Sequence, residues 1–131
     1  MLPITGLYAG ILGIIILWLC LNVVKFRRGQ RVEIGDGGDA LGIRHIRAQQ
    51  NAVEYIPIAL ILFALAEING GNPIMMHIVG VVLVFARLIH PLGLVKSKGA
   101  NFGRFWGTLL TWVALIFLAG YNIGQYIGNL L

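Results

Sequence analysis

R-H-I-R-A-Q-Q-N-A-V-E-Y-I-P, residues 44–57, is a polar and charged stretch where a second hydrophobic helix is expected to enter a membrane. If this stretch is a helix, most of its polar side chains fall on one face. Gln50 lies beside that face, and Gln49 points elsewhere. A charged side chain near the bilayer centre costs about 2.5–3.5 kcal/mol, so such residues are expected to face inward, find partners and serve a function. An ion-pair network that only holds helices together is the alternative. At about 100° per residue, five side chains share that face of a helix: Arg44, Arg47, Asn51, Glu54 and Tyr55.

The remainder of the chain is strongly apolar. Of its 131 residues, 58% are hydrophobic and 11% are charged, which excludes a soluble globular domain and indicates a single integral membrane domain, residues 1–131. The net charge is +5, and its basic residues cluster between apolar segments. That distribution suits membrane loops and lipid headgroups rather than nucleic acid. The lone cysteine, Cys20, provides neither an intrachain disulfide nor a metal cluster.

Four apolar segments are long enough to span a bilayer, at about residues 2–24, 41–68, 73–95 and 105–128. They predict an all-α integral membrane protein, a four-helix bundle. Pro57 is expected to kink the second helix near Glu54, and Glu67 at its far end is expected to be exposed to water. Glycines four residues apart are typical of close helix contacts, and two such sets occur: Gly6 and Gly10, and Gly120, Gly124 and Gly128.

The charge distribution predicts the topology. The first loop, expected at residues 25–40, and the third loop are basic, whereas the second loop and both termini carry almost no charge. The positive-inside rule therefore puts both termini in the periplasm or lumen. Arg87 and His90 share one side of the third helix, level with Arg44 and Arg47 of the second. The unusual polar residues are thus expected in one layer at the cytoplasmic half. The basic loop residues are Lys25, Arg27, Arg28, Arg31, Lys96, Lys98 and Arg104.

The polar layer predicts the chemistry of its ligand. Guanidinium groups bind carboxylates through planar, bidentate hydrogen bonds. Glu54 is suited to receive an amine, and Asn51 has both donors and an acceptor. The complement is a small zwitterion with more than one carboxylate. If that ligand carries a thiol, nearby positive charge lowers the thiol pKa and raises the thiolate fraction.

The run R-A-Q-Q-N-A-V-E-Y-I-P, residues 47–57, resembles the signature of the membrane-associated proteins in eicosanoid and glutathione metabolism, the MAPEG family. It is most similar to the R-A-Q-x-N-x-x-E-Y-x-P form in leukotriene C4 synthase. The likeness extends to the four spans, to Phe26-Arg27-Arg28 and to Phe85-Ala-Arg-Leu88. It implies a homotrimer of four-helix subunits that binds glutathione, as a cosubstrate, at subunit interfaces near the cytoplasmic face.

The same resemblance implies roles for individual residues. Arg104 and, as a second candidate, Arg28 correspond to the arginine that stabilises the thiolate, although Arg104 is offset from the family's position. Leu94 stands where synthases of the family carry a tyrosine. Arg87 and His90 resemble the R-x-x-H pair of prostaglandin E synthase-like members. The expected glutathione-binding residues are Arg44, Arg47, Asn51, Glu54, Tyr55, Arg87 and His90, with Gln49 joining from a neighbouring subunit.

The expected function is that of a glutathione transferase or peroxidase acting on hydrophobic electrophiles. Its partners would be other copies of itself, membrane lipid and a small hydrophobic electrophile. The short loops suggest a bacterial member in the inner membrane. One alternative is a small proton-coupled exporter, but such four-helix transporters place an essential glutamate in the first helix, where this chain has none. A non-catalytic structural membrane protein is the other alternative.

Overall fold

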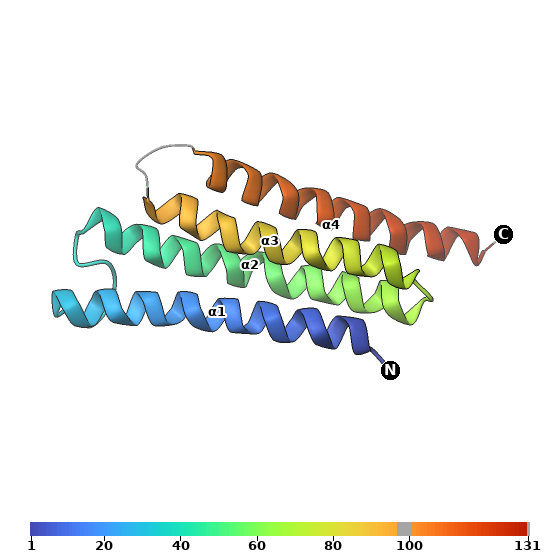
Figure 1. The fold of residues 1–131 in the computed structure, drawn as a ribbon, viewed down its shortest axis with the longest axis horizontal. Helices are drawn as coiled ribbons and strands as arrows, with labels where there is room; N and C mark the ends of the chain where they lie inside the picture. Colours follow the sequence, from blue (N-terminus) through green and yellow to red (C-terminus); the bar gives the residue numbers. More distant parts are fainter. Residues whose placement is uncertain (97–100, 131) are drawn as a thin grey trace.

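The computed structural model describes residues 1–96 and 101–130. Within them lie four helices, α1 (Pro3–Gln30), α2 (Ala40–Ile68), α3 (Pro73–Lys96) and α4 (Phe102–Gly128). They run up and down side by side, and both termini lie at the same end (Figure 1). Each helix is long and apolar enough to cross a membrane. The predicted all-α class with four spanning helices is confirmed at this level.

Two helix ends differ from the prediction. Helix α1 continues past Val24 to Gln30 and ends at Arg31, which has a left-handed backbone with φ 54°. Lysine, arginine and glutamine are good helix formers, and basic side chains interact favourably with the helix C-terminus, so the basic run extends the helix. Helix α4 begins at Phe102, where the Asn101 side chain accepts a hydrogen bond from the backbone N–H of Arg104 (3.0 Å). Lys98, part of the predicted basic third loop, lies outside the described residues.

Helix α2 is the central helix of the bundle. It contacts the other three helices, whereas α1 and α4 make no contact across the described ranges. Pro57 lies on its exposed side, and the helix continues through this residue. The buried face of α2 consists mainly of small side chains, which let the neighbouring helices approach closely: Ala48, Ala52, Ile56, Ala59, Phe63 and Ala66.

The glycines that bring α3 and α4 together are not those that the sequence pattern indicated. A Cβ atom added to Gly107 would lie 2.5 Å from the Cβ of His90, and one added to Gly103 would lie 2.7 Å from the carbonyl oxygen of Ile89. The glycines that were expected to make contacts face outward instead. A Cβ atom added to any of them would meet no described atom within 4 Å; they are Gly6, Gly10, Gly120, Gly124 and Gly128.

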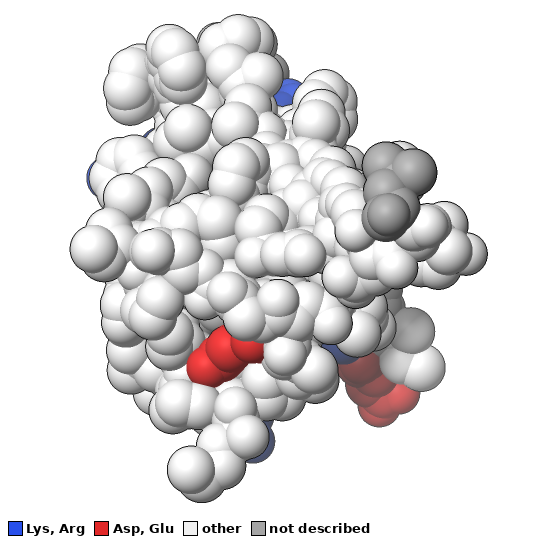
Figure 2. Space-filling view, turned by 90° about the vertical axis from the view of Figure 1, so that its right-hand side faces the viewer, with Lys and Arg blue, Asp and Glu red and all other residues white. Residues whose placement is uncertain are grey.

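Glu67 connects the end of α2 to the start of α1. Its carboxylate accepts hydrogen bonds from the backbone N–H groups of Ile4 (3.0 Å) and Thr5 (2.7 Å), and from the Thr5 hydroxyl (2.6 Å). Helix α1 has no side-chain cap of its own, so Glu67 satisfies N–H groups that are otherwise unpaired at a helix start. The prediction of a merely water-exposed carboxylate was wrong. The end of the molecule that carries the termini otherwise shows few charged atoms (Figure 2).

Candidate functional site

Arg87 of α3 lies at the centre of the predicted polar layer. Its side chain is buried, with 1% of its surface exposed. One terminal nitrogen, Nη1, donates to the Asn51 Oδ1 of α2 (2.8 Å), and Nη2 donates to the carbonyl oxygen of Gly107 in α4 (3.0 Å). The guanidinium carbon lies 5.6 Å from the centre of the Tyr55 ring, within the range of a cation–π interaction. Arg87 therefore joins three helices and fixes two residues of the predicted motif.

A second residue, Trp112, holds the motif from α4. Its indole Nε1 donates to the hydroxyl oxygen of Tyr55 (3.0 Å). Trp112 was not predicted from the sequence, although a signal was available. An indole N–H can only donate, and within a membrane-spanning helix it needs an acceptor on another element. Together, Arg87 and Trp112 place Asn51 and Tyr55 beside each other, both half-buried.

Arg47 and Glu54 occupy the outer edge of the same face of α2. Their side chains are 58% and 55% exposed, and Arg47 Nη1 lies 4.0 Å from Glu54 Oε1. Arg47 also donates to the Gln50 side-chain oxygen (3.1 Å). The expectation that charged motif residues turn inward is therefore not met by these two within one chain. A weak, exposed pair leaves both groups available to a ligand or to a neighbouring subunit.

Three further predicted residues surround this cluster. Arg44 donates a long hydrogen bond to the carbonyl oxygen of Val95 at the end of α3 (3.5 Å). His90 is buried against Gly107. Arg104 is exposed in the first turn of α4 and borders a hollow of about 460 Å³ that Trp112 also lines. Since Trp112 holds Tyr55, this hollow adjoins the cluster. Its other lining residues are Phe105, Thr108 and Leu109.

Gln49 and Arg28 lie on the α1 side of the molecule. Gln49 borders a hollow of about 290 Å³ that also includes Cys20, Val23 and Arg27 of α1. Arg28 is exposed and borders another hollow, of about 490 Å³, at the end of α1. Two residues apart on a helix means about 200° of rotation, so Gln49 and Asn51 point in nearly opposite directions. One chain thus does not bring Gln49 and Arg28 together with the cluster around Arg87.

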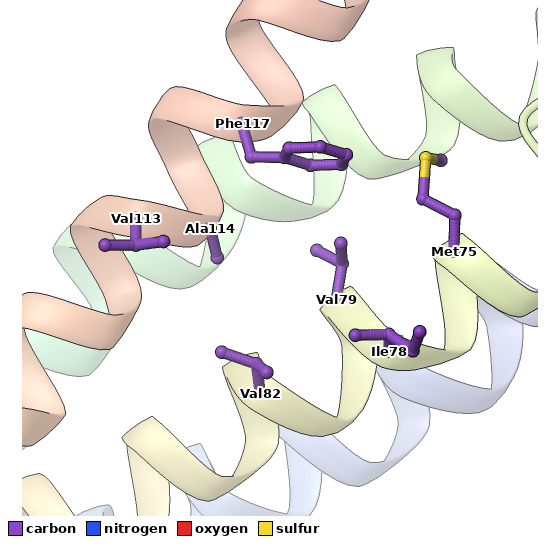
Figure 3. Close-up of a pocket in the computed structure, with 7 residues that line it drawn as sticks. All are labelled: Met75, Ile78, Val79, Val82, Val113, Ala114 and Phe117. Atoms are coloured by element: carbon purple, nitrogen blue, oxygen red, sulfur yellow. The ribbon is translucent and has the colours of Figure 1, made fainter.

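An apolar groove of about 280 Å³ runs between α3 and α4 (Figure 3). Val113, which follows Trp112 in the chain, lies on one wall, and Val82 lies on the other. Both helices are candidate membrane spans, so this groove suits a hydrocarbon group rather than a polar one. The other lining residues are Met75, Ile78, Val79, Ala114 and Phe117.

The charges in and around the cluster are mostly positive. Glu54 is the only acidic residue of the predicted site, and α2, α3 and α4 place four arginines at the same end of the bundle: Arg44, Arg47, Arg87 and Arg104. In a medium of low dielectric constant, such a layer attracts anionic groups. The arrangement is therefore suited to a ligand with an excess of negative charge, with one position for a cationic group near Glu54.

Comparison with known proteins identifies the family of this chain. Residues 5–124 match the profile of the MAPEG family. Over 120 residues the chain is 37% identical to "Inner membrane protein YecN" in each of two Escherichia coli strains, which covers 92% of this chain and 90% of that protein. These relatives and the four apolar helices support a multi-pass bacterial inner membrane protein. The chain therefore belongs to the MAPEG family, which includes glutathione-dependent transferases and peroxidases.

Proposed function

We propose that this protein binds glutathione on the polar face of α2 and activates its thiol toward hydrophobic electrophiles. The observation that carries the proposal is the arrangement of the motif. Asn51 and Tyr55 are held in place by Arg87 and Trp112, with Arg47 and Glu54 exposed beside them. Glutathione has two carboxylates and one amine, which complement the arginines and the single glutamate. The motif's likeness to that of leukotriene C4 synthase supports the same ligand.

We further propose that the complete site forms between subunits of a homotrimer. Arg47 and Glu54 are charged yet exposed on a membrane-spanning helix, a costly arrangement that another subunit and a ligand would relieve. Gln49 and Arg28 lie on the α1 side, where they would reach the ligand of a neighbouring subunit. The outward-facing glycines of α1 and α4 would permit close contact between subunits.

The proposed chemistry begins with transfer of the thiol proton to water. A guanidinium beside the sulfur stabilises the thiolate, the reactive nucleophile. Arg104 is the better candidate, because it borders the hollow that Trp112 also lines. In transfer, the thiolate forms a carbon–sulfur bond and displaces a leaving group or opens an epoxide. In peroxide reduction, two glutathione molecules give the disulfide while the hydroperoxide yields an alcohol and water.

The second substrate is proposed to be hydrophobic and to arrive from the bilayer. The groove between α3 and α4 and the hollow beside Trp112 both offer apolar surface within spanning helices (Figure 3). Leu94, in the position of the tyrosine of the family's synthases, packs against the core and offers no hydroxyl. A general detoxifying transferase or peroxidase therefore fits this chain better than a dedicated synthase of lipid mediators.

Titration of bound glutathione tests the activation step, because a thiolate absorbs ultraviolet light and a thiol does not. We expect wild-type protein to lower the pKa of the bound thiol, Arg104→Ala to return it toward its solution value, and Arg28→Ala to change it less. A restored value in Arg28→Ala alone would assign the role to Arg28. A solution-like pKa in all three proteins would show a glutathione binder without this activation.

A further inference from the structure

Asn51 has its acceptor atom occupied by a residue that can only donate. The side-chain oxygen accepts from Arg87 Nη1 (2.8 Å), and a guanidinium has five N–H donors and no acceptor. If the amide turned over, its NH2 group would face those N–H groups, so this orientation is fixed. The Asn51 nitrogen makes no hydrogen bond to any described residue. Its two hydrogens are therefore available to a ligand.

The hydroxyl oxygen of Tyr55 is likewise occupied by a residue that can only donate. Its hydroxyl oxygen accepts from the indole N–H of Trp112 (3.0 Å), which also can only donate. The hydroxyl hydrogen is thus left to point at another acceptor. Residues four apart on a helix are neighbours on one face, about 5–6 Å between Cβ atoms, so Asn51 and Tyr55 can donate to the two oxygens of one group.

We propose that Arg87 and Trp112 are positioning residues that leave only donors at Asn51 and Tyr55, so that this pair selects a carboxylate of the ligand. The inference rests on the proposed binding of glutathione and specifies how one of its carboxylates is recognised. A carboxamide in the same place would direct its own N–H toward these donors. A site built to satisfy hydrogen bonds rejects such a mismatch, because polar groups that the ligand covers are then left unpaired.

The test compares three ligands by calorimetry on the full-length protein in detergent: glutathione and its two monoamides, in each of which one carboxylate is a carboxamide. We expect wild type to bind one monoamide at least ten-fold more weakly than glutathione. Asn51→Asp keeps an oxygen for Arg87 but replaces the donor with an acceptor. We expect this variant to bind glutathione at least ten-fold more weakly than wild type and to prefer that same monoamide. Asn22→Asp adds the same charge on α1 and is expected to retain the wild-type preference.

Variants of the positioning residues complete the test. Arg87→Lys keeps a cationic donor and should retain the preference for the carboxylate. Arg87→Gln supplies an acceptor, allows the Asn51 amide to turn over and should reduce that preference several-fold, with thermal unfolding used to confirm that both variants fold. Trp112→Phe frees the Tyr55 oxygen to accept a hydrogen bond, and it should also reduce the preference for the carboxylate.

The outcomes separate this inference from the proposed function. Wild-type binding of all three ligands within two-fold would overturn the inference and leave glutathione binding intact. Equal weakening of all three by Asn51→Asp would give Asn51 a structural role and also overturn it. If wild type does not bind glutathione at all, the proposed function fails and the inference fails with it.

Discussion

At the scale of single residues, the buried guanidinium of Arg87 is the feature that requires most explanation. A charged side chain inside a membrane is costly, and no carboxylate lies within ion-pair distance of Arg87 in the described part of the chain. Two hydrogen bonds and the Tyr55 ring stabilise it instead, while its Nε remains buried without a described partner. Such a residue is expected to determine both the stability of the bundle and the form of the site.

Replacing Arg87 with alanine is expected to destabilise the protein clearly. The substitution leaves the Asn51 side-chain oxygen without a donor, at about 1–3 kcal/mol for an unsatisfied group. It also removes one of the donors to the Gly107 oxygen, which keeps its hydrogen bond from the Thr111 hydroxyl (2.7 Å). Thermal unfolding in detergent measures the effect, with the exposed Arg28→Ala as the matched control. Equal unfolding temperatures for the two variants would show that the hydrogen bonds of Arg87 do not support the fold.

Residue patterns predicted both members of the Arg87–Asn51 hydrogen bond, but only one member of the bond between Tyr55 and Trp112. The spacing of Arg47, Asn51, Glu54 and Tyr55 on one helix face was readable because it depends only on local helix geometry. Trp112 was missed because its bond to Tyr55 spans 57 positions in the chain. A periodic pattern shows which face of a helix is polar, but not which distant side chain satisfies it.

At the scale of helices too, local features could be predicted from the sequence, whereas the contacts of Glu67 and of the α3–α4 glycines with other helices could not. The number and order of the spans were predictable, because each apolar run must be about as long as a membrane is thick. The end of α1 was not, because charged residues with good helix propensity continue a helix beyond the apolar run. The start of α4 was not, because the Asn101 side chain caps the helix before the apolar run begins. Which glycines make contacts depends on how the helices pack against one another. The close contacts of Gly103 and Gly107 can therefore be seen only in the three-dimensional structure.

Glu67→Ala is expected to loosen the start of α1. Loss of a capping side chain costs about 0.5–2 kcal/mol, and here the lost acceptor serves Ile4 and Thr5. Hydrogen exchange should accelerate at these two amides, and the unfolding temperature should fall. Glu33→Ala, in the exposed loop before α2, serves as the control. Unchanged exchange at Ile4 and Thr5 in the Glu67 variant would contradict the capping role.

Gly107→Ala and Gly124→Ala form a matched pair in α4. A methyl group at Gly107 would collide with His90, and overpacking of this kind costs about 1–3 kcal/mol, whereas Gly124 has open space around it. We therefore expect thermal unfolding of the isolated chain to be shifted by the first substitution and not by the second. A tolerated Gly107→Ala would mean that α3 and α4 can separate without loss of stability.

At the scale of the whole molecule, the two sides of α2 carry different parts of the proposed site. Asn51 and Tyr55 face α3 and α4, while Gln49 faces α1. A trimer would unite them, and native mass spectrometry from detergent should show three copies. As a control for specific assembly, a substitution on the outward-facing glycines, such as Gly10→Leu, should weaken the trimer while the protomer stays folded. A monomer that binds glutathione fully would contradict this arrangement.

Calorimetric titration of the wild-type protein with glutathione tests the central claim most directly. We predict saturable binding, and Arg47→Ala should weaken it roughly ten-fold or more, since a hydrogen bond to a charged group contributes about 1.5–3 kcal/mol and each ten-fold change corresponds to about 1.4 kcal/mol. Lys25→Ala, an exposed basic residue outside the cluster, should bind like wild type. Absence of any saturable heat at millimolar glutathione, from protein that is folded, would contradict the account.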